Sequence, residues 1–204
     1  LSSGILGLEK NKKVVPTRWS ITATDSMLAE RMMAKIRECR EVEKYMVFEG
    51  EYMDNKFVIL LMPGSWEFEN FEAWAPGSTW SQGMKKTQII EEYEPFSGRT
   101  SYAEGQAGGY YSARYSISSA LFSMKRQARV LSIREVYEGY TVPLGVFVVR
   151  TAARKAMENE PAVFSTQKEA LGYMDSRLRL SLKEYMKQSR ILRQRRLTDF
   201  SGIA

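Results

Sequence analysis

Two glutamates at alternate positions, Glu67 and Glu69, are the most direct candidates for metal chemistry in this sequence. In a β-strand they would share one face, and Glu72 follows nearby. Paired carboxylates can hold a divalent ion such as Mg²⁺ or Mn²⁺, which activates water for phosphodiester hydrolysis. The pattern therefore predicts catalytic and metal-binding roles for Glu67 and Glu69. The ordinary alternative is a strand that carries acids for solubility.

Four polar residues, Arg18, Ser20, Thr22 and Thr24, alternate with less polar ones. If this segment is extended, all four side chains lie on one face. An arginine fork with neighbouring hydroxyls can cradle a phosphate. We therefore expect Arg18, Ser20 and Thr22 to bind a nucleotide or nucleic-acid phosphate, with a half-exposed strand face as the alternative.

A second candidate phosphate site is Gly108-Gly109-Tyr110, with Arg114 one turn further along. A glycine-rich entry exposes backbone N–H groups at a helix start, where anions are favoured. Tyr110 offers a ring on which a base could stack. The pattern predicts that Gly109, Tyr110 and Arg114 join the phosphate site. A tight turn packed against the sheet is the alternative.

Aromatic residues gather in and around a long segment rich in Gly, Ser and Pro, residues 75–108. A loop of this length in a compact domain is usually functional or disordered, and its aromatics argue against disorder. The aromatic side chains could be stacking platforms for single-stranded nucleic acid or could cover the core. The residues concerned are Trp66, Trp74, Trp80, Tyr93 and Tyr102.

Composition limits the chemistry that is available. The chain has 204 residues, 44% of them apolar, no histidine and a single cysteine, Cys39. Ser–His and Cys–His nucleophile pairs and multi-cysteine zinc sites are therefore excluded within this sequence. What remains is carboxylate, Lys, Tyr and Arg chemistry, or a metal held by oxygen atoms.

These residues must be positioned by helices and strands, and the order of those elements in the sequence predicts an α+β fold. We expect a mostly antiparallel sheet with flanking helices and a long basic C-terminal helix. Alternation and β-branched runs indicate strands over 14–24, 44–53, 56–62, 66–74, 87–93, 129–137 and 146–149. Apolar stripes and caps indicate helices over 25–42, 110–129 and 151–159, and a last long helix from Thr166. No apolar run approaches the length of a membrane span.

Positive charge is concentrated near the C-terminus. Residues 177–196 hold eight basic side chains against one acid, Glu184, which makes this segment +7 while the whole chain is +6. The remainder is thus about −1. A basic helix here could follow a DNA backbone or steer the C-terminal residues toward an acidic partner.

The last residues contain a short peptide from Gln194 to Ser201, with Leu197 and Phe200 one turn apart. These two apolar side chains can enter one pocket while the Gln194 amide fills a polar notch beside it. The peptide resembles the PIP motif of replication and repair proteins that bind the sliding clamp PCNA. It departs from that motif at Ser201, where many such peptides have a second aromatic. The predicted clamp-binding residues are Gln194, Leu197, Thr198, Asp199 and Phe200.

Three segments resemble signatures of the archaeal Nre (NreA-like) DNA repair proteins: 15–25 (VPTRWSITATD), 108–114 (GGYYSAR) and 143–150 (PLGVFVVR). The resemblance covers most of the chain and implies an archaeal, cytosolic, nucleoid-associated DNA damage response factor. Family members pair a similar domain with a C-terminal clamp-binding peptide. They also carry an N-terminal cysteine cluster that looks zinc-binding, so zinc would belong to a preceding part of the protein. The opening Leu1-Ser2-Ser3-Gly4, without Met, agrees with such a preceding part.

We therefore expect a globular α+β domain over residues 1–190 and a clamp-interacting tail over 191–204. The predicted function is DNA repair, with recruitment to PCNA and a domain that binds a nucleotide or nucleic acid. Hydrolysis of phosphodiester bonds, as in a metal-dependent nuclease, is one version of this hypothesis. The competing version is a non-catalytic clamp-bound adaptor that binds a protein partner. No membrane association is expected.

Overall fold

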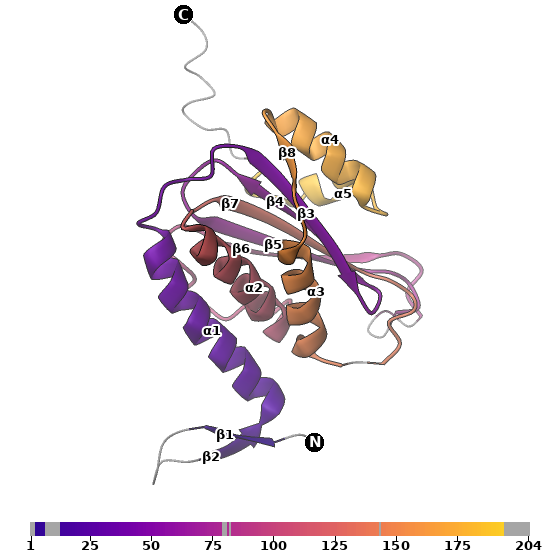
Figure 1. Cartoon of the computed structure of the whole chain (residues 1–204). Helices are drawn as coiled ribbons and strands as arrows, with labels where there is room; N and C mark the ends of the chain where they lie inside the picture. Colours follow the sequence, from indigo (N-terminus) through magenta and orange to yellow (C-terminus); the bar gives the residue numbers. More distant parts are fainter. Residues whose placement is uncertain (1–2, 7–12, 79–80, 82, 143, 194–204) are drawn as a thin grey trace, which may run out of the picture.

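A mixed six-stranded sheet forms the centre of the molecule (Figure 1). This computed structural model describes residues 3–6, 13–78, 81, 83–142 and 144–193, with side chains described from Ser20 onward. The strand order is β6-β5-β7-β4-β3-β8, in which β5 and β7 run parallel and the other neighbours antiparallel. The strands are β3 (Tyr45–Tyr52), β4 (Asn55–Met62), β5 (Glu67–Trp74), β6 (Gln88–Glu94), β7 (Arg129–Val136) and β8 (Ala162–Phe164). The predicted α+β class with a mostly antiparallel sheet is confirmed.

Helices cover both faces of the sheet (Figure 1). One face carries α1 (Thr17–Ile36), α2 (Gly108–Met124) and α3 (Val146–Glu158), and the other carries α4 (Gln167–Arg177) and α5 (Leu182–Met186). Because both faces are covered, β4 and β7 are apolar or buried at successive positions, without an exposed polar face. Among the described helices none is long and apolar enough to cross a membrane.

The N-terminal segment differs from its prediction. The strand β2 (Lys13–Pro16), paired with β1 (Ser3–Leu6), ends at Pro16, and α1 begins at Thr17. Arg18, Ser20, Thr22 and Thr24 therefore lie on a helix. The prediction that they share one face of a strand was wrong. Asp25, at the predicted start of the helix over 25–42, lies well inside α1.

Two other elements were also predicted wrongly. Residues 146–149, expected as a strand, form the first turn of α3, in which Val148 and Val149 are buried. The expected long basic helix is two short helices in the described part of the chain. The backbone is extended at Leu178, directly after α4, and α5 starts at Leu182.

The other predicted helices and strands are present close to the expected residues. The predicted strands 44–53 and 56–62 form a hairpin of β3 and β4 that turns through Met53 and Asp54, both with positive φ. The strand in the long loop is β6, and α2 opens at the two glycines. Thr166 caps α4 in a full capping box with Glu169.

Candidate functional site: a cavity at the ends of two parallel strands

A cavity of about 420 Å³ lies on the face of the sheet that α1, α2 and α3 cover, where β5 and β7 both end. Glu72 and Trp74 of β5 and Arg134 of β7 form part of its lining. In open sheets, ligands bind in the crevice at the carboxyl ends of parallel strands. The volume is within the range of small-molecule sites. This cavity is therefore the leading candidate for the functional site.

Two helices begin at this cavity. Gly108 and Gly109 open α2, and Gly145 and Val146 open α3; all four line the cavity. Neither α2 nor α3 has a side-chain cap on its N-cap residue. A helix N-terminus carries partial positive charge and favours an anion. Two such ends in one cavity favour a ligand with negative charge.

The glycines are needed because other atoms lie very close to them. A Cβ at Gly108 would lie 2.6 Å from Val146 Cγ1 and 2.7 Å from Thr22 Oγ1. A Cβ at Gly109 would lie 2.6 Å from Glu72 Oε1. These contacts are shorter than atoms tolerate, so glycine lets α1, α3 and β5 approach the start of α2.

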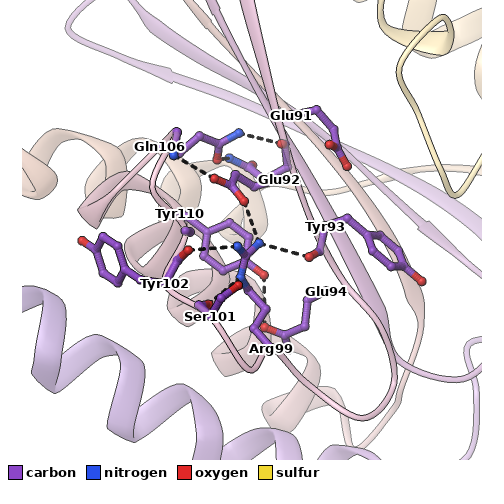
Figure 2. Close-up of polar contacts among 12 residues, drawn as sticks. Glu91, Glu92, Tyr93, Glu94, Arg99, Ser101, Tyr102, Gln106 and Tyr110 are labelled. Atoms are coloured by element: carbon purple, nitrogen blue, oxygen red, sulfur yellow. Dashed lines mark hydrogen bonds and ion pairs between the residues drawn. The ribbon is translucent and has the colours of Figure 1, made fainter.

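The loop that leads into α2 is held to β6 by side chains, as Figure 2 shows. Arg99 pairs with Glu92 at 2.7 Å and donates to the Tyr102 carbonyl at 3.2 Å. Glu92 accepts from the Gly105 N–H at 2.9 Å, and Gln106 donates to a β6 carbonyl at 2.9 Å. The glycine-rich segment thus has a fixed position relative to the strand ends.

The cavity wall formed by the sheet contains a buried ion pair. Arg134 donates to Glu72 at 2.7 Å, and its Nε donates to Asn55 Oδ1 at 3.0 Å. Trp74 Nε1 donates to the other Glu72 oxygen at 3.3 Å, and the guanidinium lies 5.0 Å from the Trp74 ring centroid. The charges of Arg134 and Glu72 largely offset each other, so the helix starts supply the remaining attraction for an anion.

Of the residues predicted to bind phosphate, two line the cavity. Thr22 projects from α1 and Gly109 lies at the start of α2. Ser20 lies on α1 but is not part of the cavity lining, and the side chain of Arg18 lies outside the described part of the chain.

Tyr110 and Arg114, predicted for the same phosphate site, lie instead in a separate buried cluster around Glu94. Tyr110 donates to Glu94 at 3.0 Å and Arg114 at 2.5 Å, while Arg114 also donates to Ser26 at 3.0 Å. Burial, together with the Glu94 charge, raises the pKa of Tyr110 well above its usual value. The structure therefore does not bring these two side chains to the cavity.

The two predicted metal ligands lie on the opposite face of the sheet from the cavity. Glu67 pairs with Arg129, and the fully buried Glu69 accepts from the Ser189 hydroxyl and the Arg190 N–H, both at 2.5 Å. Burial raises the pKa of Glu69 to about 7. In the described part of the chain no three metal-ligating side chains cluster. A catalytic metal at Glu67 and Glu69 stays a prediction.

Sequence reasoning missed Arg134, Tyr140 and Gly145 as part of the site. Arg134 comes to the cavity through the parallel pairing of β7 with β5, a long-range contact with no local signal. Gly145 was overlooked because the following valines were interpreted as a strand. A glycine directly before a helix start was the signal that could have found it.

The predicted clamp-binding residues Gln194, Leu197, Thr198, Asp199 and Phe200 lie outside the described residues. The segment just before them is anchored to the domain. Ser189 and Ile191 are buried, and the Ile191 carbonyl accepts from Arg129 Nη2 at 3.1 Å. The predicted division between a domain over 1–190 and a tail over 191–204 stays a prediction.

Comparison with known proteins gives a consistent result. The family model described as "Archaeal Nre, N-terminal" matches residues 1–81. The family model described as "Archaeal Nre, C-terminal" matches residues 94–200. A DNA repair protein NreB of Archaeoglobus fulgidus is 36% identical over 203 residues, which are 98% of this chain and 51% of the relative. A DNA repair protein NreA of Haloferax volcanii is 35% identical over 190 residues, 93% of this chain and 45% of the relative. The chain spans about half the length of these curated relatives. No solved structure matches it significantly.

Proposed function

The chain belongs to the archaeal Nre family, and from that premise we propose that it forms part of a DNA repair protein whose cavity binds a phosphate-bearing nucleic-acid ligand. Relatives that match nearly the whole chain are named DNA repair proteins, which supports the repair role. The proposal also includes recruitment to PCNA through residues 194–201.

The observation that carries the binding proposal is the pair of helix starts in one ligand-sized cavity. Gly108 and Gly109 bring the start of α2 against Thr22 and Glu72, and Gly145 places the start of α3 beside it. The backbone N–H groups at such ends bind phosphate oxygens in many nucleotide sites.

A charge placed in the cavity tests the binding proposal. Thr22→Asp puts a carboxylate of similar size beside Gly108, and Gln88→Glu adds one at the exposed end of β6. We expect each to weaken binding of dAMP, measured by isothermal titration calorimetry, by roughly tenfold or more, since one charge interaction of about 1.4 kcal/mol is a factor of ten. Thr24→Asp, on the exposed side of the same helix, is the matched control and should bind as the wild type does. If Thr22→Asp, Gln88→Glu and Thr24→Asp all bind dAMP with equal affinity, the cavity is not the binding site.

Recruitment to the clamp is tested separately. Phe200→Ala and Leu197→Ala each remove one of the two apolar anchors, so the heat of binding to PCNA should disappear. Ile203→Ala, just beyond the peptide, is the control and should bind normally. Retained binding in Phe200→Ala would remove the peptide from the proposal.

A non-catalytic adaptor is the second candidate. It is favoured by the contacts of Glu67 and Glu69, whose carboxylates already bind Arg129 and the segment around Ser189. An adaptor would bind the clamp without binding dAMP or DNA, and the two titrations above distinguish these cases.

A further inference from the structure

Aromatic side chains line the cavity in addition to the polar helix starts. Trp74, Tyr102 and Tyr140 line it together with Ile90 and Val149. A simple phosphate site needs no such surface. A ligand that matches both parts must join an anionic group to a flat apolar one.

Tyr102 is the aromatic side chain best placed to contact a ligand. The residue is 43% exposed, and its ring stacks on Tyr111 with centroids 5.2 Å apart and an interplanar angle of 26°. Tyr111 is itself fixed, because its hydroxyl accepts from the Ala103 N–H at 3.1 Å. The Arg99 contact to the Tyr102 carbonyl fixes the backbone at the same point (Figure 2). Tyr102 is thus an exposed ring with a preset orientation at the cavity.

The other rings are held in place as well. Trp74 is buried in one apolar cluster with Tyr140 and Val148, and the Arg134 guanidinium lies over its ring. The Tyr140 hydroxyl accepts from the Leu144 N–H at 3.0 Å, which ties it to the loop before α3. Rigid aromatic walls beside an anion-favouring end are the features that recognise a base and its phosphate together.

We propose that the cavity binds one nucleotide as a unit, with its base against Tyr102 and its phosphate at the starts of α2 and α3. This inference rests on the proposed function, which supplies the phosphate site, and adds recognition of the base. The nucleotide comes either from the free pool or from a DNA strand in which it is unstacked from its neighbours. A base within an intact duplex cannot reach such a cavity, because its faces are covered by adjacent base pairs.

A nucleotide and its two fragments test the inference on the wild-type 204-residue chain. The probes are dAMP, 2-deoxyribose 5-phosphate, which lacks the base, and deoxyadenosine, which lacks the phosphate. We expect dAMP to bind at least about tenfold more tightly than either fragment, because it makes both sets of contacts. Intrinsic tryptophan fluorescence, to which Trp74 in the cavity contributes, and calorimetry measure the binding.

A substitution at Tyr102 tests the stacking contact. Tyr102→Ala should weaken dAMP binding by about 5- to 150-fold, the effect of one base on one aromatic ring. The same change should leave 2-deoxyribose 5-phosphate unaffected. Tyr102→Phe keeps the ring and should bind dAMP normally, and Phe122→Ala, an exposed aromatic near the far end of α2, is the matched control.

The outcomes separate this inference from the proposed function. If 2-deoxyribose 5-phosphate binds as tightly as dAMP, or Tyr102→Ala leaves dAMP affinity unchanged, the phosphate site stands and base recognition is overturned. If no phosphate-bearing probe binds, both fail. Competition by a single-stranded oligonucleotide, but not by the same sequence as a duplex, would assign the ligand to DNA. Binding of dAMP without competition by either would assign it to the free nucleotide pool.

Discussion

Glu94 accepts hydrogen bonds from three side chains of the core: Trp66 at 3.3 Å, Tyr110 at 3.0 Å and Arg114 at 2.5 Å. Glu94 is fully buried and Arg114 nearly so. A buried charge that loses its partner is far more destabilising than a missing surface ion pair. This carboxylate therefore has a structural role that is distinct from the cavity.

Glu94→Gln keeps the shape of the side chain and removes the charge that compensates Arg114. We expect the free energy of unfolding in urea to fall by about 3 kcal/mol. Glu30→Gln is the matched control, since Glu30 lies 3.7 Å from the same guanidinium but is exposed, and it should cost less than about 1 kcal/mol. A similar loss in the two variants would contradict the role given to Glu94.

Glu69 makes the stability depend on pH. Burial raises the pKa of its carboxyl from 4.5 to about 7, and Glu91 beside it adds to the shift, although Ser189 and Arg190 oppose it. The native state holds this proton more tightly than the unfolded chain does. Unfolding therefore releases a proton between these two pH values, and the free energy of unfolding should fall as pH rises from 4.5 to 7, by up to about 3 kcal/mol.

Glu69→Gln cannot release a proton, so its unfolding free energy should change less over the same pH range, measured by urea unfolding at several pH values. Glu158→Gln, an exposed acid on α3, should follow the wild-type curve. A Glu69→Gln curve parallel to that of the wild type would show that this carboxyl titrates normally.

At the scale of helices and strands, contacts between elements determined the secondary structure of the segments that were predicted wrongly from the sequence. Residues 17–24 are rich in β-branched types that favour strands, yet they form a helix in which Thr22 and Asp25 are buried. Asp25 pairs with Arg150 of α3 at 2.5 Å and accepts from Ser112 of α2 at 2.8 Å. Such contacts between helices override local propensity and leave no periodic signal in one segment.

The candidate site was predicted in part for the same reason. Gly109 could be identified because a glycine-rich entry to a helix exposes the backbone N–H groups that favour an anion. Glu72, Trp74 and Arg134 meet only through the pairing of β5 with β7, strands separated by more than fifty residues along the chain. Their shared position follows from topology, which local patterns do not specify.

The contact between α3 and β3 depends on Gly50. A Cβ at Gly50 would lie 2.6 Å from the Cα and the backbone N of Ala156, atoms that cannot move aside as a side chain can. Gly50→Ala should therefore push α3 away from the sheet and lower the free energy of unfolding by about 1–3 kcal/mol.

Gly172→Ala is the matched control for this prediction. Gly172 lies within α4 with no atom within 4 Å of its added Cβ, so alanine should stabilise the helix by about 0.5–1 kcal/mol. Thermal unfolding of both variants measures the difference. Equal shifts would mean that α3 has room to move.

At the scale of the whole molecule, the two matched family segments build one sheet. Residues 1–81 supply β3, β4 and β5, while residues 94–200 supply β7, which lies between β5 and β4. Without β7, the first segment would leave two strand edges unpaired in the middle of the sheet. The boundary between the matched segments is therefore not a boundary between folding units.

Separate expression of the two parts tests this conclusion. Residues 1–93 alone and 94–204 alone should each lack a cooperative thermal transition, because each loses the partner strands that bury its apolar side chains. Mixing them should restore circular dichroism close to that of the full chain, since β7 can then pair on both sides. Phe57→Ala, which removes a buried β4 side chain that contributes to the shared core, should weaken this reassembly, whereas Met53→Ala, at the exposed hairpin turn, should not. A cooperative transition in either fragment by itself would show that the family segments fold independently.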